Sequence, residues 1–147
     1  MEWYKKVNPV KVDGWVDELT DDAAFNFESY AECFISENLV RKYIRAKKIP
    51  LSLEASSEAG QMKVRETESK NRGNISIEIR RVKGDLSYLD MKHLSNLVDK
   101  KEPAKEACLA RDASEYKPIR DAVAHTALLT NVAKHMTGFT FLYHSMS

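Results

Sequence analysis

Apolar side chains recur every three to four positions along much of the chain, and this spacing predicts amphipathic α-helices. The first helix is expected from Thr20, whose hydroxyl suits a helix N-cap and which two aspartates follow, to about Lys47. Pro50 then prevents its continuation. The apolar stripe changes face near Ser36, which indicates either a bend or burial on more than one side.

The first fifteen residues contain two pairs that are typical of turns, Asn8-Pro9 and Asp13-Gly14. We therefore expect an N-terminal arm over residues 1–15 rather than a continuation of the helix. Its large aromatic side chains are expected to pack onto the body of the protein. They are Trp3, Tyr4 and Trp15.

The middle of the chain is more ambiguous. Residues 51–72 are rich in Ala, Glu and Lys, which favours an exposed helix and leaves a loop or a partner-facing surface as alternatives. Isoleucines then alternate with polar residues, which predicts a short half-buried β-strand at residues 75–79, within a β segment near residues 75–81. Some apolar residues there also fit a helical stripe, namely Ile75, Ile79, Val82 and Leu86.

The C-terminal half again has helical spacing. We expect an amphipathic helix over residues 87–99 and, after a charged break, one or two helical turns within residues 104–113. Another helix is expected to begin near Pro118, because proline suits a first helical turn. The predicted fold class is therefore mainly α: a single domain over residues 1–147, built as a bundle of four to five helices.

Composition agrees with one helix-rich globular domain, since 31% of the 147 residues are charged and 43% are hydrophobic. The formal net charge is only +1, so any affinity for nucleic acid has to come from local basic clusters. Most such clusters are solvated faces without a partner. Those in this chain are Arg41, Lys42, Arg45, Lys47 and Lys48; Arg80, Arg81 and Lys83; and Lys100, Lys101 and Lys105.

Cys33 and Cys108 show neither metal-ligand spacing nor a disulfide framework, so we expect both to be core residues in a reducing compartment. His93, His135 and His144 lack the spacing of a helical metal pair, and we predict no metal and no cofactor. Residues 1–6 lack the apolar run of a signal peptide, and no 18-residue apolar run occurs. A cytoplasmic protein without a membrane span is expected.

One short segment combines residues that can carry chemistry. Asp121 and His125 are four positions apart, so on a helix their side chains can meet, and a carboxylate would orient the imidazole and favour its protonated form. Arg120 is rotated from His125 by roughly 140 degrees about the helix axis. A guanidinium that binds phosphate and a histidine that moves a proton suit metal-free cleavage of RNA.

This segment resembles the signature of HEPN domains, in which an arginine, a polar residue, three further residues and a histidine lie on a late helix. The similarity extends over residues 115–126 (EYKPIRDAVAHT) and is weaker in residues 86–91 (LSYLDM). It implies a helical bundle that pairs with a second copy, so that the two motifs face a shared cleft. Many such domains are metal-independent ribonucleases of toxin–antitoxin pairs or antiviral defence.

The resemblance implies that Arg120 and His125 are catalytic and that Asp121 is the supporting polar residue. The expected activity is endonucleolytic attack by the ribose 2'-hydroxyl, which leaves 2',3'-cyclic phosphate ends. The expected partners are RNA, a second copy and an antitoxin or regulatory protein. Residues expected to contact RNA are Tyr116, Lys117, Arg41 and Arg45.

Two other functions stay open. The same helices could form a non-catalytic module that dimerises or binds a partner protein or nucleotide, a use that the charged stretch at residues 52–72 would suit. A DNA-binding helical domain rests only on the basic cluster at residues 41–48, and no recognition helix is evident. Asp121 also counts against strong RNA binding, because a carboxylate repels phosphate.

Overall fold

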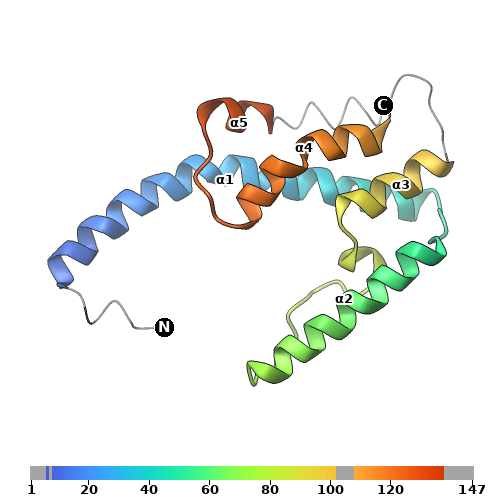
Figure 1. The fold of residues 1–147 in the computed structure, drawn as a ribbon, viewed down its shortest axis with the longest axis horizontal. Helices are drawn as coiled ribbons and strands as arrows, with labels where there is room; N and C mark the ends of the chain where they lie inside the picture. Colours follow the sequence, from blue (N-terminus) through green and yellow to red (C-terminus); the bar gives the residue numbers. More distant parts are fainter. Residues whose placement is uncertain (1–5, 7, 102–107, 138–147) are drawn as a thin grey trace.

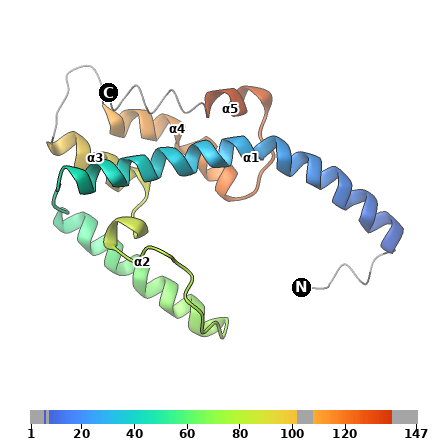
Figure 2. The same cartoon turned by 180° about the vertical axis from the view of Figure 1, so that it is seen from behind.

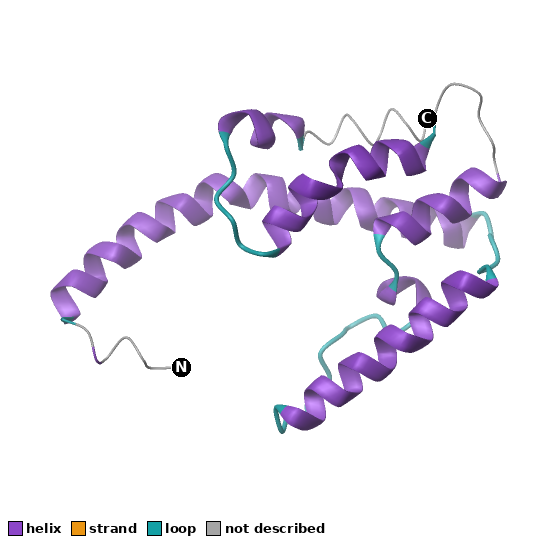
Figure 3. Ribbon diagram, viewed as in Figure 1, coloured by secondary structure: helices purple, strands orange, loops and turns teal. Residues whose placement is uncertain are grey.

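The structure is a computed structural model and describes residue 6 and residues 8–101 and 108–137. Within these ranges helices dominate, and Figure 3 shows loops but no strand between them. The predicted mainly helical class and the number of helices are confirmed. The elements are α1 (Pro9–Ala46), α2 (Leu53–Arg72), the 3₁₀ helix η2 (Asp85–Tyr88), α3 (Met91–Lys101), α4 (Leu109–Ala124) and α5 (Asn131–Met136).

Helix α1 is the longest element, with 38 residues and a length of about 57 Å. It begins at Pro9, where a fixed φ and a missing N–H cost nothing. At its end Lys48 adopts a left-handed conformation with φ of 52°, and the Ile49 N–H donates to the Ile44 carbonyl over 3.0 Å. This capping turn and Pro50 end the helix within one residue of the predicted position.

The N-terminal arm predicted over residues 1–15 is wrong for residues 9–15, and the predicted helix start is wrong as well. Residues 9–15 already belong to α1, and the Thr20 hydroxyl donates to the Val16 carbonyl over 2.7 Å inside the helix instead of capping it. The Trp15 side chain is 41% exposed and therefore does not pack onto the body. Trp3 and Tyr4 lie outside the described residues. The start was missed because Asn8-Pro9 is as suitable for a helix start as for a turn.

The hydrophobic core lies where the second half of α1 packs against α3 and α4 (Figures 1 and 2). From Ser29 onward each turn of α1 contributes a buried side chain, whereas before it no described side chain of α1 is buried. Among the buried apolar residues are Val40 and Ile44 of α1, Leu94 and Leu97 of α3, and Leu109, Ala113 and Tyr116 of α4. The first half of α1 extends beyond this core (Figure 1).

The region predicted as one helix at residues 87–99 is interrupted. It begins as η2, leaves helical geometry at Leu89, and continues as α3. The Asp90 carboxylate accepts a hydrogen bond from the His93 N–H over 3.2 Å, and this bond stabilises the start of α3.

Helix α4 begins well before Pro118, which lies inside it, so the predicted start of this helix is also wrong. The cap comes from another helix: the Asp99 carboxylate of α3 accepts hydrogen bonds from the N–H groups of Leu109 and Ala110, over 3.1 and 2.8 Å. A cap supplied from a neighbouring helix leaves no signal in the local sequence, which explains the error. Of the turns expected at residues 104–113, the first four residues lie outside the described ranges.

Helix α2 is confirmed, and it forms an arm that diverges from α1 in Figure 1. Ser52 caps it by accepting the Ala55 N–H over 3.1 Å. The Glu66 carboxylate ties the following loop to α2, because it accepts hydrogen bonds from Arg80 Nε and from the Tyr88 hydroxyl, each over 2.8 Å. The Tyr88 hydroxyl bond and the Arg80 contacts lower the pKa of the Glu66 carboxyl, although partial burial opposes them.

The β-strand predicted at residues 75–79 is wrong, and the wider segment to residue 81 is irregular as well. Ile75, Ile77 and Ile79 are 44%, 69% and 54% exposed in the loop between α2 and η2. An alternating pattern stabilises a strand only where a second strand accepts its main-chain hydrogen bonds. The part of the chain that the structure describes offers no such strand.

A left-handed turn also ends α4. Thr126 has φ of 62°, and the Ala127 N–H donates to the Ala122 carbonyl over 2.9 Å. The chain then crosses α1, where the side-chain amide of Asn26 donates to the Ala127 carbonyl over 2.7 Å and accepts the Leu129 N–H over 3.1 Å. These two bonds hold the α4–α5 loop against the middle of α1.

Candidate functional site

Arg120 projects from the last turns of α4 toward the second half of α1. Its Nε donates to Glu37 Oε1 over 2.8 Å. The Glu37 side chain is 11% exposed, and its other oxygen lies 3.5 Å from Arg41 Nη2. One buried carboxylate on α1 therefore holds two guanidinium groups, one of them from α4.

Burial lowers the pKa of Arg120, but the hydrogen bond and the negative charge of Glu37, followed by the charge of Asp121, outweigh burial and leave the pKa raised. Burial also lowers the pKa of Arg41, and Glu37 opposes that change. Both guanidinium groups remain cationic at neutral pH, because arginine is not deprotonated in proteins under ordinary conditions.

Arg41, predicted to contact RNA, directs its guanidinium inward. Its Nε and Nη2 donate to the carbonyls of Leu86 and Leu89, each over 2.9 Å, and its Nη1 donates to Asn38 Oδ1 over 3.1 Å. These bonds attach η2 and the start of α3 to α1. The geometry favours a structural role for Arg41, whereas Arg45 is exposed in the last turn of α1.

Asp121 contacts cations rather than the histidine. Its carboxylate binds Lys117 Nζ and lies 3.6 Å from Arg120 Nη1. The Lys117 hydrogen bond, followed by the charges of Lys117 and Arg120, lowers the pKa of the Asp121 carboxyl despite slight desolvation. No hydrogen bond or ion pair joins Asp121 to the His125 side chain within the described ranges.

His125 is the C-cap residue of α4, with φ of −92° and ψ of 14°, so regular helical geometry ends there. Its N–H still donates to the Asp121 carbonyl over 2.9 Å, but the side chain is exposed and has no hydrogen-bond partner among the described residues. The expectation that four-residue spacing brings the two side chains together assumed a helix that continues past His125.

Tyr116, another predicted RNA contact, is a core residue. It is 6% exposed, and its hydroxyl oxygen lies 2.7 Å from Cys33 Sγ. Burial is the main cause that raises the pKa of both Tyr116 and Cys33, so both side chains stay neutral at physiological pH. Stacking of Tyr116 on a base would require it to leave the core. Cys33 is buried as predicted, whereas Cys108, also predicted to be a core residue, is only half-buried because it lies at the start of α4, with its thiol donating to the Asp99 carboxylate over 3.3 Å.

Two hollows border Arg120. The first, named here the Arg120 groove, has a volume of about 300 Å³ and lies between α1 and α4. Its lining includes Tyr30, Phe34, Glu37, Arg41, Arg80 and Arg120. The second, the α3–α4 hollow, has a volume of about 100 Å³, and Arg120 lines it together with Lys92, Lys117 and Asp121.

A third hollow is mostly apolar and is named here the apolar groove. It lies between α1 and the α4–α5 loop and has a volume of about 330 Å³. Its lining includes Leu19, Phe27, Tyr30, Val123 and Leu128. Because Tyr30 and Val123 also line the Arg120 groove, the apolar surface runs directly into the cationic one.

No protein-family model, curated protein or solved structure matches the chain. None of the helices in the described ranges is both long and apolar enough to cross a membrane. In the same ranges, no three His, Cys, Asp or Glu side chains are grouped so that they could hold a metal ion. The function has to be inferred from the residues and their geometry.

Sequence reasoning missed Glu37, which positions Arg120. A local signal did exist, because Glu37 falls between Cys33 and Val40 on the face of α1 that is buried, where a charge is costly unless it is paired. Its partner could not be identified, because Arg120 is 83 positions away. Lys92 in the α3–α4 hollow was missed for a similar reason, since it borders the site only after α3 packs on α4.

Proposed function

We propose that the protein is a metal-independent endoribonuclease of HEPN type that acts as a homodimer. Arg120 binds the scissile phosphate, and His125 transfers protons. The observation that carries the proposal is how the Arg120 guanidinium is held and what surrounds it. Glu37 holds its Nε edge in a partly buried ion pair, Nη1 lies 3.6 Å from Asp121, and Arg120 lines two hollows.

In this reaction the ribose 2'-oxygen attacks the adjacent phosphorus, and the bond from phosphorus to the 5'-oxygen breaks. A proton leaves the 2'-hydroxyl, and a proton is delivered to the departing 5'-oxygen, while Arg120 stabilises the negative charge on the phosphoryl oxygens. The products are a 2',3'-cyclic phosphate and a 5'-hydroxyl. The exposed imidazole of His125 can reach RNA without any rearrangement of the core.

A homodimer accounts for the exposed apolar row on α1. The row follows helical spacing, as in a helix–helix seam. Its large members include Val16, Leu19, Phe27, Tyr30 and Phe34, which are 53–70% exposed, and the exposed Ala23 fills the eight-residue gap between Leu19 and Phe27. In an antiparallel pair of α1 helices this row is covered in both copies. The Arg120 groove then lies at the edge of the contact, because Tyr30 and Phe34 line it.

Charge along α1 supports the antiparallel arrangement. The first three quarters of the helix are acidic, with Asp13, Asp17, Glu18, Asp21, Asp22, Glu28 and Glu32. Its end and the following turn are basic, with Arg41, Lys42, Arg45, Lys47 and Lys48. Antiparallel pairing places the acidic part of one copy against the basic end of the other, which favours this orientation over the parallel one.

The decisive experiment incubates the purified protein with mixed cellular RNA in excess EDTA and analyses the fragments and their 3' ends. His125→Ala and Arg120→Ala are each expected to abolish cleavage while helical content and dimerisation persist. His135→Ala is the matched control, because His135 is also an exposed histidine, on α5, and is expected to leave cleavage unchanged. Equal cleavage by all four proteins, or ends without cyclic phosphate, would remove the assignment.

The second candidate is a non-catalytic module that dimerises or binds a partner protein or nucleotide. The position of Asp121 favours it, since this carboxylate contacts both Lys117 and Arg120 and opposes the approach of phosphate. Intact RNA in the EDTA assay, together with a nucleotide or protein that raises the melting temperature, would establish this function instead. A cytoplasmic toxin or antiviral effector controlled by an antitoxin is the biological setting that we propose for the ribonuclease.

A further inference from the structure

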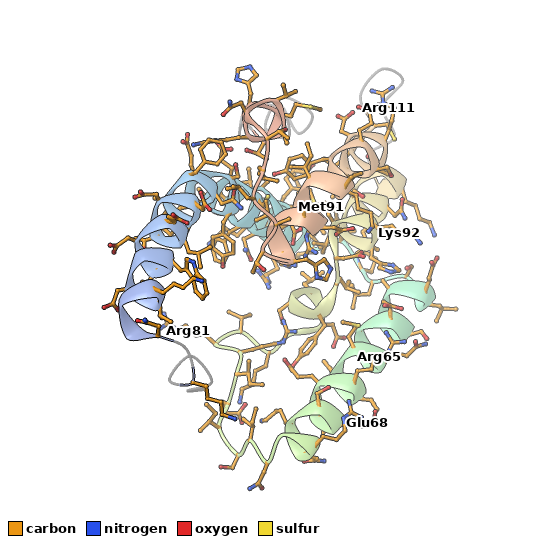
Figure 4. All side chains as sticks on the ribbon, turned by 60° about the vertical axis from the view of Figure 1, so that its left-hand side comes forward. Arg65, Glu68, Arg81, Met91, Lys92 and Arg111 are labelled. Atoms are coloured by element: carbon orange, nitrogen blue, oxygen red, sulfur yellow. The ribbon has the colours of Figure 1, made fainter. Side chains whose placement is uncertain are left out.

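The α3–α4 hollow and the Arg120 groove share Arg120 in their linings, and their other lining residues differ. Side chains of both helices line the hollow, and Figure 4 shows Lys92 on α3 beside the ribbon of α4. The charged members of the lining are Asp90, Lys92, Lys117, Arg120 and Asp121, and Ser114 and Tyr116 are the residues with a hydroxyl group. Its volume of about 100 Å³ suits one phosphate group rather than a whole nucleotide.

The lining of this hollow carries three cationic side chains and two carboxylates, and one of the cationic side chains has no partner among the described residues. Lys117 and Arg120 share the Asp121 carboxylate. The Asp90 carboxylate accepts the His93 N–H at the start of α3. The exposed ammonium group of Lys92, in contrast, has neither a hydrogen bond nor an ion pair within the described residues. Lys92 can therefore bind an anion without giving up an existing contact.

We propose that the α3–α4 hollow binds an RNA phosphate next to the one on Arg120, and that Lys92 is its principal ligand. The identity of the ligand as RNA rests on the proposed function. Arg120 lines both the Arg120 groove and the α3–α4 hollow. An RNA strand that lies across Arg120 therefore places consecutive phosphates in the groove and in the hollow. Lys92 thus extends the substrate-binding surface onto α3, which the sequence motif does not include.

The test separates binding from cleavage by using a single-stranded 2'-O-methyl oligoribonucleotide, which lacks the attacking hydroxyl. Its affinity for the full chain is measured by fluorescence anisotropy over a range of salt concentrations. Lys92→Ala is expected to weaken binding about fivefold. It is also expected to reduce the slope of log affinity against log salt by about 0.7, the value for one single-strand phosphate contact.

Lys70→Ala is the matched control, because it removes the same charge near the far end of α2, away from α3 and α4 in Figures 1 and 2. This variant is expected to bind like the wild type. Inorganic phosphate is expected to compete less effectively with the oligonucleotide in Lys92→Ala than in the wild type. Circular dichroism verifies that both variants keep their helical content, as expected for a surface lysine.

The outcomes distinguish this inference from the proposed function. If the wild type cleaves RNA but Lys92→Ala and Lys70→Ala bind the oligonucleotide equally well, the hollow is not a phosphate site and the ribonuclease stands. If the wild type leaves RNA intact but binds the oligonucleotide in a Lys92-dependent way, the phosphate site stands and the ribonuclease fails. A wild type that does not bind the oligonucleotide at any salt concentration overturns the phosphate site.

Discussion

The two halves of α1 belong to one unbroken helix but have opposite surroundings. From Ser29 to Ala46 the helix supplies a buried side chain at every turn and holds Arg120 through Glu37. Before Ser29 the helix exposes an apolar row and buries none of its described side chains. The second half therefore owes its stability to α3 and α4, whereas the first half buries no described side chain and contacts the rest of the chain near its end, where Asn26 holds the α4–α5 loop.

The stability of the single chain and its association with another molecule should therefore depend on different parts of α1. Substitutions in the second half should change the free energy of unfolding of the single chain. Substitutions in the exposed row should leave that energy almost unchanged and act on association with another molecule. Three changes along α1 test this division, in order of decreasing effect.

Glu37→Ala should have the largest effect, a loss of about 3 kcal/mol in the free energy of unfolding. It leaves Arg41, whose side chain is 12% exposed, and Arg120 without their shared carboxylate. Urea denaturation measures the loss. Glu32→Ala, on a neighbouring turn of α1, is the control and should cost less, since the Glu32 carboxylate accepts a hydrogen bond from the buried Thr137 hydroxyl over 2.8 Å and its loss leaves no guanidinium without its carboxylate. A loss below about 1 kcal/mol for Glu37→Ala would show that the ion pair is dispensable.

Phe27→Ala should weaken the dimer by about 2 kcal/mol without changing the stability of the monomer, because both copies carry the substitution and each loses about 1 kcal/mol from a side chain that pairing buries in part. Phe27 is 70% exposed in the single chain and lines the apolar groove. Sedimentation equilibrium measures the dissociation constant, which should rise about thirtyfold. Leu53→Ala removes a 93% exposed side chain from α2 and should not affect the dimer. Equal dissociation constants for Phe27→Ala and wild type would contradict pairing through this row.

Asn26→Ala should have the smallest effect, about 1 kcal/mol, because it removes hydrogen bonds that are only partly shielded from water. Asn26 lies where the two halves of α1 meet and holds Ala127 and Leu129. Thermal denaturation measures the loss of stability. If the proposed ribonuclease is correct, kcat should also fall, since His125 directly precedes the loop that Asn26 holds. Unchanged kcat with reduced stability would limit Asn26 to a structural role.

The fold was predictable where local signals decide the structure. Pro50 located the end of α1, and the composition of residues 51–72 indicated α2. Prediction failed where the decisive partner is distant in sequence or missing. Asp99 caps α4 from another helix, and the isoleucines at residues 75–79 have no strand to pair with among the residues that the structure describes. Neither fact can be inferred from a local pattern.

For the candidate site, the motif identified Arg120, Asp121 and His125, but their roles as catalytic residues stay predictions. Spacing alone predicted that Asp121 would orient His125, whereas in the structure Asp121 contacts Lys117 and Arg120. The buried position of Tyr116 and the inward guanidinium of Arg41 depend on how α4 and η2 pack against α1. This packing depends on contacts along the whole chain, so it cannot be derived from one motif.

The long separation between Glu37 and Arg120 has a consequence for synthesis of the protein. Because the chain emerges from the ribosome N-terminus first, α1 is complete long before α4 is available to pack against it. Arg120 acquires its buried carboxylate only at that late stage. A ribonuclease with this layout would be inert as a nascent chain until α4 has emerged from the ribosome and packed against α1.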